Sequence, residues 1–108
     1  MRGMVDEGTI QRAVELLREA AHPRKIILFG SYARGQAREG SDVDLLVIED
    51  RFESRRKEWA RLRASLSPLR IPVDLILCTK EHFKDWSDCP GTVYFEANRD
   101  GKVLYEAA

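Results

Sequence analysis

The sequence lacks several features that would assign the protein to a particular class. No apolar run approaches the ~18–20 residues needed to cross a membrane. The formal net charge at pH 7 is zero, so the overall charge makes no direct case for nucleic acid as a partner. The two cysteines, Cys78 and Cys89, fit no zinc or redox spacing. We therefore expect two reduced thiols, with Cys78 buried in a strand.

Nothing at the N-terminus resembles a basic-then-apolar targeting signal, which favours the cytoplasm and argues against a membrane protein. Hydrophobic residues at 44% and charged residues at 33% are typical of a soluble globular protein. The chain has no repeats, linkers or low-complexity segments. We expect one domain covering residues 1–108, large enough for a modest core.

What the sequence does contain is an unusual stretch, residues 26–47, around which we expect the chain to be organised. Ile26 to Phe29 is short, apolar and partly β-branched, as in a buried strand. Gly30 follows where the backbone must turn tightly. Ser31 is then placed to cap a helix, whose free N–H groups would form a site for an anion such as phosphate.

The residues after this turn predict a helix over residues 32–38. Arg34 and Arg38 would share one face of that helix at the i, i+4 spacing. Arg34 is therefore a further candidate for contact with a bound phosphate.

The second half of the stretch carries an Asp-x-Asp pair, Asp42 and Asp44, that leads directly into an apolar strand. In an extended chain both side chains point to the same side, ~6.6–7 Å apart. Aspartate is disfavoured in strands, and two neighbouring like charges repel. Mg²⁺ would relieve that repulsion, since it prefers carboxylate oxygens and substrate phosphates. A metal-bound nucleotide would thus fit both halves of the stretch.

Neither motif is informative alone, because Gly-Ser is a common turn and a lone Asp-x-Asp is most often a solvated loop. Their combination is a more specific signal: Gly30-Ser31, ten intervening residues, then Asp42-Val43-Asp44. This pattern resembles the signature of the polymerase-β-like nucleotidyltransferase superfamily. The runs over residues 29–35 and 41–45 are typical of its small stand-alone members, the minimal nucleotidyltransferases.

The remaining segments predict an α/β fold, a mixed sheet of three to four strands with helices packed against it, in the order of a nucleotidyltransferase core. In its last strand, Val103 and Tyr105 would lie on one face, and Trp86 would belong to the core. The expected helices cover residues 9–21, 53–67 and 91–99, and Thr79 would cap a short turn that runs through Trp86. The expected further strands cover residues 43–48, 73–77 and 102–106.

Asp74 is a single carboxylate among the apolar residues of a predicted strand, where unpaired burial would be costly. It could pair with an arginine or contribute to the metal site. The resemblance implies the second role, because the family places a third carboxylate on a neighbouring strand. Residues 51–70 carry seven Arg or Lys against two Glu, and their role is left open between a solvated helix face, a docking surface and an aid to triphosphate binding.

The resemblance further implies transfer of a nucleoside monophosphate, AMP from ATP, to an acceptor hydroxyl with release of pyrophosphate. Asp42, Asp44 and Asp74 would hold two Mg²⁺ ions, and Asp74 would act as the base or as a ligand that lowers the pKa of the hydroxyl. Gly30 and Ser31 would bind the β- and γ-phosphates, with help from Arg34.

The 108 residues leave no room for a domain that selects the acceptor, so we expect another molecule to supply it. Minimal nucleotidyltransferases commonly pair with a HEPN-type toxin and act as its antitoxin by transferring AMP to a tyrosine of the partner. Two alternatives remain: a catalytically weak module that binds a nucleotide or partner, and a small-molecule nucleotidyltransferase. The nucleobase, the acceptor, activity without a partner and the oligomeric state are left open.

Overall fold

Four strands form one mixed sheet in the computed structural model, which describes residues 4–108. Helices precede and connect these strands. The elements in chain order are α1 (Glu7–Ala20), β1 (Lys25–Phe29), α2 (Gly30–Ala33), β2 (Val43–Glu49), α3 (Arg55–Ser65), the 3₁₀ helix η1 (Ser67–Leu69), β3 (Val73–Thr79), α4 (Lys80–Trp86), α5 (Val93–Asp100) and β4 (Lys102–Glu106). The expected α/β class with a mixed sheet is confirmed.

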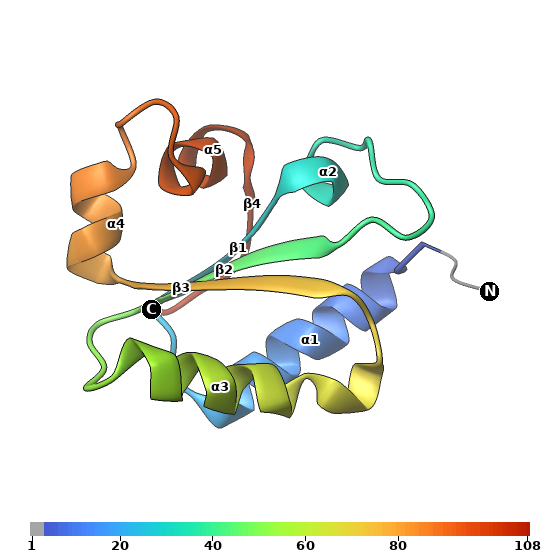
Figure 1. Ribbon diagram of the computed structural model, residues 1–108, viewed down its shortest axis with the longest axis horizontal. Helices are drawn as coiled ribbons and strands as arrows, with labels where there is room; N and C mark the ends of the chain where they lie inside the picture. Colours follow the sequence, from blue (N-terminus) through green and yellow to red (C-terminus); the bar gives the residue numbers. More distant parts are fainter. Residues whose placement is uncertain (1–3) are drawn as a thin grey trace.

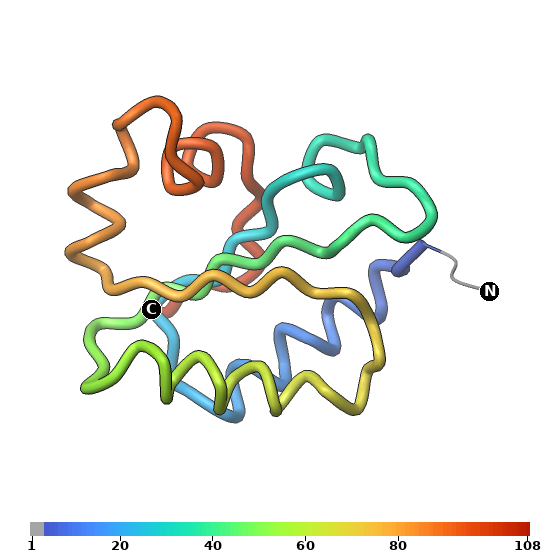
Figure 2. The backbone as a smooth tube through the Cα atoms, viewed as in Figure 1, coloured from blue at the N-terminus to red at the C-terminus, as the bar shows by residue number. Residues whose placement is uncertain are grey.

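The strands lie in the order β3–β2–β1–β4, so β3 and β4 are the two edges. β1 is antiparallel to both of its neighbours, whereas β2 and β3 run parallel. Parallel neighbours need a crossover connection, and the segment through α3 supplies it beneath the sheet (Figure 2). α1 and α3 cover one face, α4 and α5 cover the other, and α2 lies at the end of β1 (Figure 1).

The apolar strands are explained by burial on both faces. Along β2, Val43, Leu45 and Val47 belong to the core shared with α1 and α3. Leu46 and Ile48 point the other way, into the core shared with α4 and α5. A strand that is covered on both faces reads as a continuous apolar run, and this is why Asp44 stands out within it.

Several predicted elements are confirmed with small shifts of their bounds. The Thr79 hydroxyl caps α4 by accepting the His82 backbone N–H at 3.1 Å. Cys78 is buried in β3, as expected. The helix expected over residues 53–67 is shorter, because Ser54 caps it and the chain tightens into η1 after it. None of the helices within residues 4–108 is long and apolar enough to cross a membrane.

The prediction of a helix over residues 32–38 is wrong. α2 ends at Ala33, and Gly35 follows with a φ of +69°, a left-handed conformation in which glycine is favoured. The helical spacing of Arg34 and Arg38 is therefore without structural meaning, since no helix face carries both of them.

Two expectations near the C-terminus are also wrong. Val103 pairs with Ile27 and Tyr105 pairs with Ile26, because an irregularity in the β1–β4 register inserts one extra residue. Val103 and Tyr105 thus lie on opposite faces. Trp86 is 44% exposed and lies outside the core, because it ends α4 at the surface.

A buried acid at the end of β2 links three elements. Glu49 is only 8% exposed, and its Oε2 is without a hydrogen-bond partner among the described residues. Burial, followed by a hydrogen bond to Glu58 and the charge of that group, raises the pKa of Glu49 to about 8. Arg61 binds both Glu58 oxygens at 2.8 Å and also donates to the Ala20 carbonyl, so β2, α3 and α1 are joined here.

We predict that this group makes stability depend on pH. The folded protein keeps the Glu49 proton up to about pH 8, whereas the unfolded chain loses it near the usual pKa of 4.5. The stability that this proton confers is therefore present at low pH and is lost as the pH rises to about 8. Glu49→Gln keeps a neutral donor, so its unfolding free energy in urea should vary less with pH.

Glu53→Gln, which changes an exposed glutamate nearby, is the control and should follow the wild-type pH dependence. A wild-type pH dependence that persists unchanged in Glu49→Gln would contradict this interpretation.

Candidate active site

Two of the predicted carboxylates lie side by side in the sheet. Asp44 of β2 and Asp74 of β3 are direct partners in the parallel register, although thirty positions separate them in the chain. Each lies two positions before a residue that packs in the core shared with α4 and α5, Leu46 in β2 and Ile76 in β3, so both side chains are on that face. The parallel pairing therefore builds a local concentration of negative charge.

The third carboxylate, Asp42, is exposed and lies immediately before β2. Its charge reaches Asp44 closely enough to help raise the pKa of that group. Asp74 is exposed on the edge strand, so the cost expected from its burial does not arise. None of the three forms an ion pair within residues 4–108, so the alternative that Asp74 pairs with an arginine is not seen.

Asp44 is the carboxylate of the cluster whose pKa is clearly raised. Partial burial raises its pKa to about 6, and the charges of Asp74, Asp42 and Glu96 add to the effect in that order. All of these causes favour the protonated form. A nearby cation would stabilise the ionised form of this carboxylate, and this is the property expected of a ligand for a divalent metal ion.

Gly30 brings the turn into contact with this cluster. Phe29, the last residue of β1, pairs with Asp44, so the chain turns directly beside that carboxylate. Gly30 has a φ of +71°, and a Cβ added there would lie 2.0 Å from the Asp44 Oδ2. A glycine is therefore required both by the backbone conformation and by the close approach.

Ser31 is not the helix cap that the sequence suggested. α2 begins at Gly30 with Phe29 as its N-cap residue, and no side chain caps it. Ser31 is instead the second residue of this single turn and is partly exposed beside Gly30. The N-terminus of α2 nevertheless lies beside the Asp44 carboxylate, because Gly30 packs directly against it.

Arg34 follows α2 and lies at the rim of the site. Its Nη1 is 3.4 Å from the Oε2 of Glu96, a residue of α5. Glu96 is a contributor that sequence reasoning missed, because nothing in the sequence around α5 indicates that this helix packs against α2. It orients Arg34 and at the same time adds negative charge near Asp44.

The residues fit a divalent metal ion by their donor chemistry. With the side chains as they stand, no group of three His, Cys, Asp or Glu within residues 4–108 is arranged for coordination. Asp44 and Asp74 are nevertheless adjacent in the sheet, and Asp42 is close enough to help raise the pKa of Asp44. Carboxylate oxygens are the ligands that Mg²⁺ prefers.

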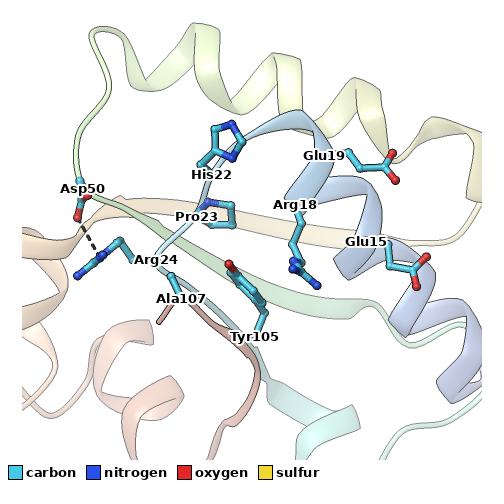
Figure 3. Close-up of a pocket in the computed structure, with 9 residues that line it drawn as sticks. All are labelled: Glu15, Arg18, Glu19, His22, Pro23, Arg24, Asp50, Tyr105 and Ala107. Atoms are coloured by element: carbon cyan, nitrogen blue, oxygen red, sulfur yellow. Dashed lines mark ion pairs between the residues drawn. The ribbon is translucent and has the colours of Figure 1, made fainter.

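A separate hollow lies at the opposite end of the sheet, near the start of β1 and the ends of β2 and β4 (Figure 3). The Arg18 guanidinium lies over the Tyr105 ring at 4.3 Å, and Arg24 pairs with Asp50 at 3.2 Å. Its cavity, of about 570 Å³, contains none of the three carboxylates. The two features are therefore independent.

Comparisons with known proteins agree with this geometry. Protein adenylyltransferase MntA of Thermococcus cleftensis is 44% identical over 62 residues, 56% of this chain and 62% of the relative. A chain of a toxin–antitoxin complex with AMP-PNP superimposes with a TM-score of 0.65 at 24% identity, covering 95% of this chain and 75% of its own. The fold is therefore that of nucleotidyltransferases.

A second structural neighbour is a chain from the complex of tri-AMPylated Shewanella oneidensis HEPN toxin with MNT antitoxin. Its TM-score is 0.61 at 20% identity, covering 94% of this chain and 72% of its own. The curated matches span between 21% and 62% of the relatives' own lengths. The nucleotidyltransferase domain model matches residues 10–99, and the chain belongs to that family.

We predict that Gly30→Ala is more damaging than Gly35→Ala. Both glycines have positive φ, +71° and +69°, so either alanine costs ~1–2 kcal/mol of stability. Only Gly30 faces the Asp44 carboxylate, and nothing lies within 4 Å of a Cβ at Gly35. Overpacking at Gly30 should add ~1–3 kcal/mol.

Urea denaturation of both variants measures this difference directly. Equal losses of stability would show that the backbone conformation alone selects glycine, and that the close approach to Asp44 is unimportant.

Proposed function

We propose that the chain is a single nucleotidyltransferase domain that transfers a nucleoside monophosphate, AMP from ATP, to an acceptor hydroxyl and releases pyrophosphate. The observation that carries this proposal is the cluster itself. Asp44 and Asp74 are in register, Asp42 adds its charge, and the Gly30 turn packs against Asp44. Membership of the nucleotidyltransferase domain family supports the reaction class.

The roles of the side chains follow from their positions. Backbone N–H groups at Gly30 and the Ser31 hydroxyl would bind the β- and γ-phosphates, and Arg34, which pairs with Glu96, would assist them. Asp42, Asp44 and Asp74 would hold Mg²⁺, and nucleotidyltransferases of this family generally use divalent metal. Two such ions held by these carboxylates would stabilise the charge that develops in an in-line displacement.

The reaction itself exchanges one bond for another. The acceptor oxygen forms a bond to the α-phosphorus, the bond from that phosphorus to the bridging oxygen breaks, and pyrophosphate leaves. Asp74 is exposed on the edge strand, so an acceptor can approach it, and we assign to it the proton of the attacking hydroxyl.

We propose a tyrosine of a HEPN-type protein as the acceptor, which makes the chain an antitoxin. Two observations support it: the similar Thermococcus cleftensis protein is named a protein adenylyltransferase, and a structural neighbour comes from a complex of an AMPylated HEPN toxin with its antitoxin. The open position of Asp74 is compatible with a macromolecular acceptor, since no described element covers it.

The test is transfer of label from α-labelled ATP to a HEPN-type protein that binds this chain, with Mg²⁺ present. Asp44→Asn and Asp74→Asn should each lower the rate by at least ~10²-fold. Ser31→Ala removes a hydrogen bond to a charged phosphate, worth ~1.5–3 kcal/mol, and should slow transfer by about tenfold or more.

Asp50→Asn is the matched control, because Asp50 is an exposed aspartate at the opposite end of β2. It should label the partner at the wild-type rate. A wild-type protein that binds the partner and ATP but transfers no label would contradict the catalytic proposal and identify a docking module.

A further inference from the structure

The segment of residues 51–70 is the most strongly charged part of the surface. It holds seven Arg or Lys against two Glu, in a chain whose total charge is zero. Within the described residues, only Arg61 among these seven forms an ion pair, with Glu58. The remaining six cations are free to bind an anion: Arg51, Arg55, Arg56, Lys57, Arg63 and Arg70.

The two long sides of α3 differ in what they contact. Arg61 is used structurally, since it binds Glu58 and the Ala20 carbonyl at the end of α1. Arg56, Trp59 and Arg63 have the spacing i, i+3 and i+7, which places them together on another side of the helix. We call these three residues the basic stripe.

Trp59 gives the basic stripe a flat aromatic surface. Its Nε1–H donates to the Leu75 carbonyl at 2.7 Å, and Leu75 belongs to the edge strand β3. The indole is therefore held in a fixed orientation, yet 41% of Trp59 stays exposed. An aromatic ring that is already ordered loses little conformational entropy when another planar group stacks on it.

The basic stripe does not belong to the candidate active site. α3 packs on the face of the sheet opposite to α4 and α5, whereas Asp44 and Asp74 lie on the face that α4 and α5 cover (Figure 1). The alternative that these arginines assist triphosphate binding is therefore not favoured. The arginines of the basic stripe therefore bind a different anion or contact only solvent.

We propose that the basic stripe on α3 binds single-stranded nucleic acid, with a base stacked on Trp59 and the sugar–phosphate backbone held by Arg56 and Arg63. Proteins that bind single strands without sequence preference combine a cationic track with aromatic rings, on which a base gains ~1–3 kcal/mol. The stripe supplies both groups on one side of the helix, where Arg56 and Trp59 are exposed and Arg63 is partly exposed.

An acidic protein is the main competing partner, and the composition of the surface argues against it. The centre of a stable protein interface does use tryptophan and arginine, but they lie within a contiguous and mostly apolar patch that excludes water. Around Trp59 the exposed neighbours on α3 are instead cationic or small, as Arg55, Arg56 and Ala60 are. A flexible polyanion with bases can satisfy both the charges and the single ring.

The test uses Trp59 as its own reporter. Trp86→Phe leaves Trp59 as the only tryptophan, and its fluorescence is followed during titration with ~12-nucleotide oligouridylate or oligodeoxythymidylate. We expect quenching and an affinity that falls with salt. Arg56→Gln with Arg63→Gln should weaken binding at least tenfold and reduce the slope of log K against log salt by ~1.4.

Lys80→Gln with Lys84→Gln is the matched control, since it removes the same charge from exposed positions on α4. It should leave the affinity and the slope unchanged. Asp44→Asn should also bind normally, so loss of adenylyl transfer and loss of this surface are distinguishable. Tighter binding of the oligouridylate would identify the ligand as RNA, and tighter binding of the oligodeoxythymidylate would identify it as DNA.

Three results would overturn the proposal. They are absence of quenching with either oligonucleotide, equal affinity in the arginine and lysine variants, and binding of polyglutamate as tight as that of the oligonucleotides. The last of these would assign the surface to an acidic protein. Urea denaturation of each variant shows that it is folded when it is tested.

Discussion

The parallel pairing of β2 with β3 is the constraint on which the site depends. It aligns Asp44 with Asp74 on one face, although like charges in direct register repel each other. The burial of the surrounding aliphatic residues holds the two strands in place against that repulsion. Asp44 shows the cost, because its pKa rises to about 6. The repulsion around Asp44 thus destabilises the free protein, and a bound cation with its nucleotide would remove that destabilisation.

The same pairing organises the elements around the carboxylates. β1 pairs with the other edge of β2, so Phe29 lies opposite Asp44 and the Gly30 turn begins beside it. α5 returns over this end and brings Glu96 to Arg34. The α3 crossover that makes β3 parallel lies on the other face, so its basic stripe is separated from the candidate active site. The α3 crossover therefore puts a basic surface on one face of the sheet, while the acidic cluster lies on the other face.

The sequence predicted the elements that depend on local patterns. The strands, the Thr79 cap and the three aspartates follow from short-range rules and from the Gly30-Ser31 motif. The errors have long-range causes. The helix expected after Ser31 stops where Gly35 turns, and Val103 and Tyr105 are separated by a register irregularity that only strand pairing can reveal. Glu96 reaches the site through tertiary packing, which leaves no local signal. The metal assignment itself stays a prediction.

Calorimetry with ATP is the most direct test of the central claim, that the paired carboxylates form a metal-dependent nucleotide site. The proteins are wild type, the double variant Asp44→Asn with Asp74→Asn, and Asp50→Asn as the control at the far end of β2. The account predicts binding only with Mg²⁺, in wild type and control, and none in the double variant. Equal ATP binding without Mg²⁺, or in the double variant with Mg²⁺, would contradict it.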